Sequence, residues 1–227
     1  MAAAVTEAAV PFSYAVRRSD RARRVRVAVD PRTGEVEVVL PRRVPQREAL
    51  AAVVELRPWI ERRRAEAAAV QARLRERGDT VPYLGRALRL RPEPGRTRVH
   101  RRGDVLLVPP GEAARPALER WYRRQARAEV QPRLDAAARA VGRPYTRLSI
   151  RDQRTRWGSC TAGGAISINW RLLLAPEEVL EYVVRHEACH LAVMNHSPRF
   201  WELMARVMPG YEAPRRWLRE HGATLVL

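Results

Sequence analysis

Residues 186–201 read HEACHLAVMNHSPRFW, and the first five of them form an HExxH pattern. Positions four apart on an α-helix lie one turn apart on the same face, so His186 and His190 can both reach a single metal ion. Glu187 lies slightly off that face, where its carboxylate can stand beside the metal without binding it. His196 follows six residues after His190. We expect it to be the third ligand.

Three of the five histidines of the chain fall within the eleven residues 186–196, at spacings that suit a tetrahedral site with one open position. A helix that ends near Asn195 would bring His196 back toward the other two histidines, because asparagine tolerates the left-handed turn that reverses a chain. Three carboxylates further along the chain are alternatives for the third ligand, namely Glu202, Glu212 and Glu220.

Three neutral imidazoles favour zinc, which lowers the pKa of a water in its open position to about 7. Glu187 would then take a proton as general base and deliver it to the leaving group. Arg156 has two interpretations, stabilisation of an oxyanion or a structural salt bridge, and we favour the salt bridge. We expect Cys189 to be a small buried apolar residue rather than a ligand. Cys160 has the same interpretation, although thiolate coordination is an alternative for it.

The residues before the HExxH pattern predict the support for this site. Ala175-Pro176-Glu177-Glu178 begins a helix, because proline suits the first position and acids suit the positive end of the helix dipole. Most sides of that helix are apolar, so it should be central and buried. Alternating residues over 147–170 predict a small antiparallel meander. Its segment 165–170 is either an edge strand that pairs with an extended peptide or an ordinary core strand.

Further toward the N-terminus, residues 118–141 predict an amphipathic helix that bends at Pro132 and stops at Gly142. Residues 24–40 predict a β-hairpin, and residues 45–77 predict a helical stretch broken near Arg57 by the following proline. Short apolar runs between residues 84 and 108 predict more strands. Pro109-Pro110-Gly111 is a linker signal. The fold class is therefore α+β, with a basic N-terminal region over 1–110 and the domain that carries the site over 111–227.

The chain has 227 residues and a net charge of +18, and all 43 of its basic residues are arginine. Residues 1–150 hold 33 arginines against 17 acidic residues. Such a surface can bind nucleic acid, phosphorylated ligands or acidic proteins, or can simply keep the protein soluble. The two cysteines form no CxxC pattern, so we expect a cytoplasmic protein rather than a disulfide-rich secreted one. We expect no membrane partner, because no apolar run approaches the roughly 18 residues of a membrane span.

Three segments resemble the YgjP-like zinc metallopeptidases, which are relatives of the SprT-like proteases. They are RTRWGSC at 154–160, ISINWRLLLAP at 166–176 and HEACHLAVMNHSPRFW at 186–201. The resemblance implies a β-rich N-terminal region followed by a zincin-like C-terminal domain. It also implies one zinc ion on His186, His190 and His196, with a catalytic Glu187. The RWGSC segment matches the family too, without an assigned chemical role.

These observations predict a zinc-dependent metallopeptidase that acts on a peptide or protein substrate. One alternative is a metal-dependent pyrophosphohydrolase of nucleoside triphosphates, of the UTP type, in which arginines would converge on the cleft. Another is a DNA-associated SprT-like protease, recruited to nucleic acid through the Arg-rich N-terminal half. A purely structural zinc site is disfavoured, since a glutamate beside an open three-histidine site has no structural purpose.

Overall fold

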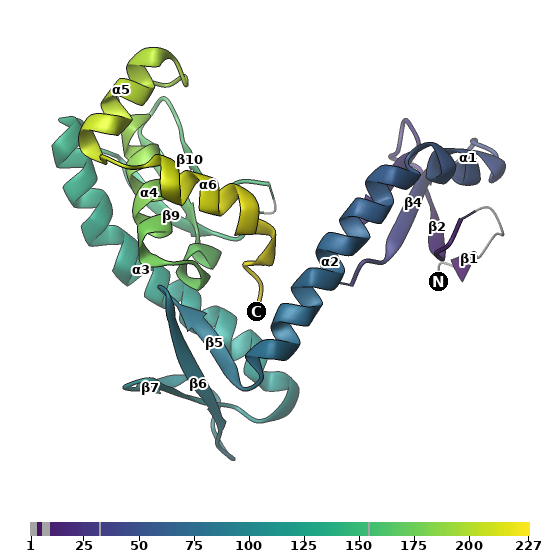
Figure 1. The fold of residues 1–227 in the computed structure, drawn as a ribbon, viewed down its shortest axis with the longest axis horizontal. Helices are drawn as coiled ribbons and strands as arrows, with labels where there is room; N and C mark the ends of the chain where they lie inside the picture. Colours follow the sequence, from purple (N-terminus) through teal and green to yellow (C-terminus); the bar gives the residue numbers. More distant parts are fainter. Residues whose placement is uncertain (1–3, 6–9, 32, 154) are drawn as a thin grey trace. The chain divides into compact units, whose positions relative to one another are not determined.

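The structure is a computed structural model that describes residues 4–5, 10–31, 33–153 and 155–227. The chain is a mixed α+β protein that divides into two compact units, residues 1–76 and residues 77–227 (Figure 1). Each unit has its own hydrophobic core. Among the described residues, no helix has both the length and the apolar character needed to cross a membrane.

The first unit consists of one sheet and two helices. The strands are β1 (Ala4–Val5), β2 (Tyr14–Ser19), β3 (Arg26–Val29) and β4 (Val36–Pro41), in the order β1-β2-β4-β3. Strands β3 and β4 form the predicted hairpin, with Val27 opposite Val38 and Val29 opposite Val36. Helix α1 (Arg47–Glu55) ends two residues before α2 (Arg57–Arg77) begins, which confirms the predicted break.

The second unit begins with the sheet β5 (Thr80–Tyr83), β6 (Arg86–Pro92), β8 (Val105–Val108) and β7 (His100–Arg102), in that spatial order. This sheet packs on helix α3 (Ala114–Val141), where the ring of Tyr83 lies 5.5 Å from Trp121 and 6.3 Å from Tyr122. The boundary predicted after residue 110 therefore lies inside the second unit, because these strands share one core with the helices that follow.

A second sheet of this unit contains β9 (Arg147–Arg151), β10 (Gly158–Cys160) and β11 (Ala165–Asn169), in the order β10-β11-β9. Strands β10 and β11 are antiparallel, but β11 and β9 are parallel, so the prediction of an antiparallel meander is wrong for this pair. The connection after β9 carries the chain past β11 before β10 begins. Strand β11 is consequently central, so of the two alternatives for segment 165–170 the structure shows the core strand and not the edge strand.

The remaining helices form the body of the second unit. Helix α3 continues through Pro132 and ends at Gly142, whose positive φ of 72° stops the helix as predicted. The others are α4 (Glu177–Cys189), α5 (Pro198–Val207) and α6 (Glu212–His221), with short 3-10 turns η1 (Gly111–Ala113), η2 (Trp170–Leu174) and η3 (Gly222–Thr224). Most of α4 is buried, as its apolar sides predict.

Candidate metal centre

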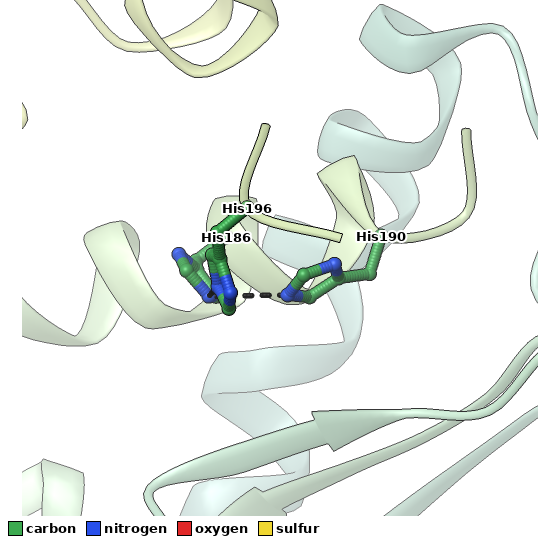
Figure 2. Close-up of side chains that lie close together, drawn as sticks. All are labelled: His186, His190 and His196. Atoms are coloured by element: carbon green, nitrogen blue, oxygen red, sulfur yellow. Dashed lines mark hydrogen bonds between the residues drawn. The ribbon is translucent and has the colours of Figure 1, made fainter. Parts of the chain in front are cut away.

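Three imidazoles converge at the C-terminal end of α4. His186 lies in the last turn of this helix, His190 is the cap residue directly after it, and His196 comes from the loop that follows (Figure 2). The Nε2 atom of His186 lies 3.2 Å from Nε2 of His190 and 3.0 Å from Nε2 of His196. Two nitrogens bound to one tetrahedral zinc at 2.0–2.1 Å are about 3.3 Å apart. The donor set and its spacing therefore fit a single zinc ion.

The route of the chain into this loop differs from the prediction. Helix α4 ends at Cys189, several residues before Asn195, and Asn195 does not have a positive φ. Instead, the backbone reverses through successive turns, in which Leu191 N–H donates to Ala188 and Ala192 N–H donates to Cys189. A reversal spread over several residues needs no left-handed residue, which is why the asparagine signal was misleading.

The early end of the helix also fixes the tautomer of one ligand. Nδ1 of His190 lies 3.0 Å from the Val193 carbonyl oxygen, which can only accept a hydrogen bond. The proton of the ring is therefore on Nδ1, and the lone pair of Nε2 faces the other two histidines. Burial lowers the pKa of His190, and burial together with the neighbouring histidines lowers the pKa of His186 to about 3. Both rings are thus neutral, as metal ligation requires.

Two aromatic residues of α5 support the three imidazoles. Phe200 is fully buried, and its ring centre lies 4.9, 4.6 and 4.8 Å from those of His186, His190 and His196. Trp201 stacks on His196 at 5.5 Å with an interplanar angle of 25°. The histidine spacing alone did not connect either residue to the site. Their position four and five residues after His196 was the available signal.

Glu187 stands beside the histidines and is packed against strand β10. It is 6 % exposed, and a Cβ atom added at Gly158 would lie 2.6 Å from its Cγ and 2.7 Å from its Cδ. Only a glycine allows this approach, since carbon atoms in contact are normally 3.5–4.0 Å apart. The RWGSC segment therefore has a structural role that its sequence did not reveal: its glycine makes room for the glutamate of the HExxH pattern.

The electrostatic environment of Glu187 combines burial with a nearby cation. Burial raises the pKa of its carboxyl to about 8, while the charge of Arg156 lowers it. A divalent cation on the adjacent histidines would add a second positive charge and favour the carboxylate further.

Two exposed arginines flank the centre. Arg156 lies two residues before Gly158, and Arg215 of α6 holds its guanidinium 4.3 Å above the ring of Trp201. Neither forms an ion pair within the part of the chain that the structure describes. The favoured prediction of a structural salt bridge for Arg156 therefore finds no support among the described residues.

The alternative ligands lie elsewhere. Glu202, Glu212 and Glu220 are exposed, and none belongs to the cluster of potential ligands. Cys189 is buried with its sulfur 3.9 Å from that of Met204, as expected of a small apolar residue. Cys160 is half-buried, and burial raises the pKa of its thiol to about 11, which disfavours the thiolate that a metal needs.

The loop that leads into β10 is held by a buried asparagine. Asn169 is 2 % exposed, and its Nδ2 donates to the carbonyls of Gln153 at 2.8 Å and Arg156 at 3.3 Å. Its Oδ1 accepts from the N–H of Arg171, which caps η2. These contacts hold the backbone at Gln153 and at Arg156, and so help to position Arg156 and the nearby Gly158.

Comparisons with known proteins indicate the family of the chain. The model of a family described as "YgjP-like, metallopeptidase domain" matches residues 23–221. The chain is also similar to the crystal structure of the metallopeptidase zymogen of Pyrococcus abyssi abylysin, at 24% identity and a TM-score of 0.37 over 40% of this chain and 93% of that one. A comparison with curated proteins found no match.

Proposed function

This chain belongs to the YgjP-like metallopeptidase family, and on that premise we propose that it hydrolyses peptide bonds as a zinc-dependent enzyme with Glu187 as general base. The observation that supports this proposal best is the convergence of three imidazoles beside one buried carboxylate. His186, His190 and His196 would hold the ion. Bound there, zinc supplies Lewis acidity, which lowers the pKa of water to about 7 and polarises the scissile carbonyl.

The protein's own groups would perform the proton transfers. Glu187 follows His186 directly, so its carboxylate stands beside the metal ligands rather than among them. It would take the proton of the attacking water and deliver it to the leaving amine. Gly158 keeps the carboxylate in place, because β10 closes over it with no side chain between them.

The sheet beside α4 offers a place for the substrate chain. Strand β10 is an edge strand, paired with β11 on one side only, and its Gly158 lies against Glu187. We propose that an extended peptide pairs with the free edge of β10, which would set the scissile bond beside the carboxylate. This role replaces the one that the sequence suggested for β11.

One observation favours a second candidate function, the hydrolysis of nucleoside triphosphates. That reaction requires cations around the site to bind the phosphates. Arg156 and Arg215 are exposed and flank the histidines without an acidic partner in the described structure. The same arginines would equally bind acidic groups of a peptide, and we favour the peptide because of the family and the edge strand.

A parallel assay on the zinc-loaded protein and its Glu187→Gln variant tests the proposal. Both would be incubated with casein and with a panel of nucleoside triphosphates. We expect casein cleavage to fall about 10²- to 10⁴-fold in the variant, as for loss of a general base, with zinc content unchanged. Glu202→Gln is the matched control, since Glu202 is exposed on α5, and it should cleave at the parent rate.

The outcomes separate the two candidate functions. Glu187-dependent release of phosphate with casein intact would move the site to nucleotide chemistry. Casein cleavage that survives Glu187→Gln at full rate would remove Glu187 from the mechanism. Cleavage of neither substrate by the zinc-loaded parent would reject both candidates for these substrates.

A further inference from the structure

The sheet of strands β5 to β8 carries an ordered set of basic side chains. In the order β5-β6-β8-β7, strands β6 and β7 lie on either side of β8. The strand register places their residues in two rows across the sheet, Arg89–Val105–Arg102 and Arg91–Leu107–His100. Each row thus has a basic residue on β6 and another on β7. We call Arg89, Arg91, His100 and Arg102 the basic sheet face.

These four residues share the outer face of the sheet. Side chains alternate between the two faces of a strand, and Leu88 and Leu106 lie on the opposite face, fully buried in the core. The four basic residues are exposed. Neighbouring strands are about 4.8 Å apart and residues two apart along a strand are about 7 Å apart, so the Cα atoms of the four residues lie at the corners of a rectangle of about 10 by 7 Å.

The arginines of this face form no salt bridges among the described residues. None of Arg89, Arg91 and Arg102 forms an ion pair with a residue that the structure describes. Nearby arginines are engaged differently: Arg96 pairs with Glu93, and Arg101 points to the inner face, with its guanidinium 4.9 Å above the ring of Tyr83. Residues 86–104 contain seven arginines and two acidic residues, Glu93 and Asp104. The face therefore concentrates positive charge that no ion pair among the described residues offsets.

We propose that the basic sheet face binds the phosphodiester backbone of a nucleic acid strand. Guanidinium groups pair well with phosphate oxygens. Four basic residues spread over this area of the sheet complement a ligand that carries several negative groups, as the successive phosphates of a nucleic acid strand do. The face carries no Phe, Tyr or Trp on which a base could stack, so the contacts go to the backbone and do not depend on sequence.

The location of this face separates it from the metal centre. It belongs to the same compact unit, residues 77–227, but the sheet lies at the end of the unit away from α5 (Figure 1). Binding at the basic sheet face therefore leaves the three histidines uncovered, and it does not depend on what the metal centre hydrolyses.

Fluorescence anisotropy with the full chain and a labelled 20-nucleotide single strand, once as DNA and once as RNA, tests the proposal over a series of salt concentrations. Each phosphate contact on a single strand contributes about 0.7 to the slope of log K against log salt. The triple variant Arg89→Ala/Arg91→Ala/Arg102→Ala should therefore lower the slope by about 2 and weaken binding at low salt at least tenfold. The corresponding triple change to lysine should keep the slope.

The matched control removes the same charge from arginines that have partners. Arg17, Arg57 and Arg63 pair with Glu37, Glu61 and Glu66, so the triple Arg17→Ala/Arg57→Ala/Arg63→Ala should leave the slope unchanged. Equal losses in both alanine triples would show that overall charge, rather than this face, binds the strand, and would overturn the proposal. So would an unchanged slope in the first triple, or equal binding of polyglutamate. Thermal melting of each variant would confirm folding, because exposed substitutions usually change stability by less than about 0.5 kcal/mol.

Discussion

Replacing Gly158 by alanine is the sharpest test of how the site is assembled. The added Cβ would lie 2.6 Å from Cγ and 2.7 Å from Cδ of Glu187, about 1 Å closer than carbon atoms tolerate. Gly158 does not have a positive φ, so the backbone itself accepts alanine and the cost is steric. The flexible partner is the glutamate side chain, which has to move by about 1 Å.

A displacement of this size has a calculable effect on a general base. A misplacement of about 1 Å typically costs about 100-fold in rate, which corresponds to about 2.7 kcal/mol in the barrier. Overpacking in a well-packed region costs about 1–3 kcal/mol in stability. The three atoms nearest to the added Cβ all belong to Glu187 and none to a metal ligand, so zinc content should stay at the parent level. We expect Gly158→Ala to be folded, zinc-loaded and about 100-fold slower in casein cleavage.

A double-mutant cycle in the free energy of unfolding isolates the contact without using any substrate. Glu187→Ala removes the three atoms that the new Cβ would meet, so Gly158→Ala should cost about 1–3 kcal/mol in the parent and nearly nothing in the Glu187→Ala background. Gly163→Ala is the control, because its nearest atom is 4.0 Å away. The same cost in both backgrounds would refute the contact, and parent activity in Gly158→Ala would refute its importance.

Three further predictions concern the support of the site. Chelation of the metal should lower the melting temperature and zinc should restore it, because an ion held by three histidines binds only the folded state; calorimetry with unchanged melting would contradict the site. Phe200→Ala should destabilise the protein by about 3–5 kcal/mol and weaken zinc binding in a chelator competition, with Phe200→Leu milder; parent zinc affinity in the alanine variant would deny it a supporting role. Asn169→Ala should cost about 1–3 kcal/mol in denaturant unfolding, since two carbonyls lose their donor; a smaller cost would mean that water replaces it.

The parts of the site that the sequence predicted well are those set by local spacing. Residues four apart on an α-helix lie on the same face, whatever packs around the helix. The sequence alone therefore predicted that His186 and His190 lie close together. His196 also lies beside the other two histidines, as expected, although the predicted route of the chain to it, through a turn at Asn195, was wrong. A turn can be built from several backbone paths, and the type of one residue does not select among them.

The parts that the sequence did not predict depend on contacts between distant segments. Strand β9 pairs in parallel with β11, although alternation of apolar residues predicts a strand without predicting its partner or direction. The sheet of β5 to β8 was assigned to the N-terminal region because a Pro-Pro-Gly linker follows it. Its buried face packs on α3 all the same, so the linker connects parts of one core rather than two domains.

The same distinction governs the arginines, whose number alone does not indicate a function. Arg133 contacts Glu129, Glu177 and Glu181, so its charge ties α3 to α4 and is not available to a ligand. Arg89 has an identical side chain, yet it faces solvent beside other basic residues and forms no ion pair with a described residue. A composition of 43 arginines contains both kinds in unknown proportion. Only the partners of each residue separate structural charge from charge that can bind a ligand. That separation points to two places in the second unit, the flank of the metal centre and the basic sheet face, each with its own test.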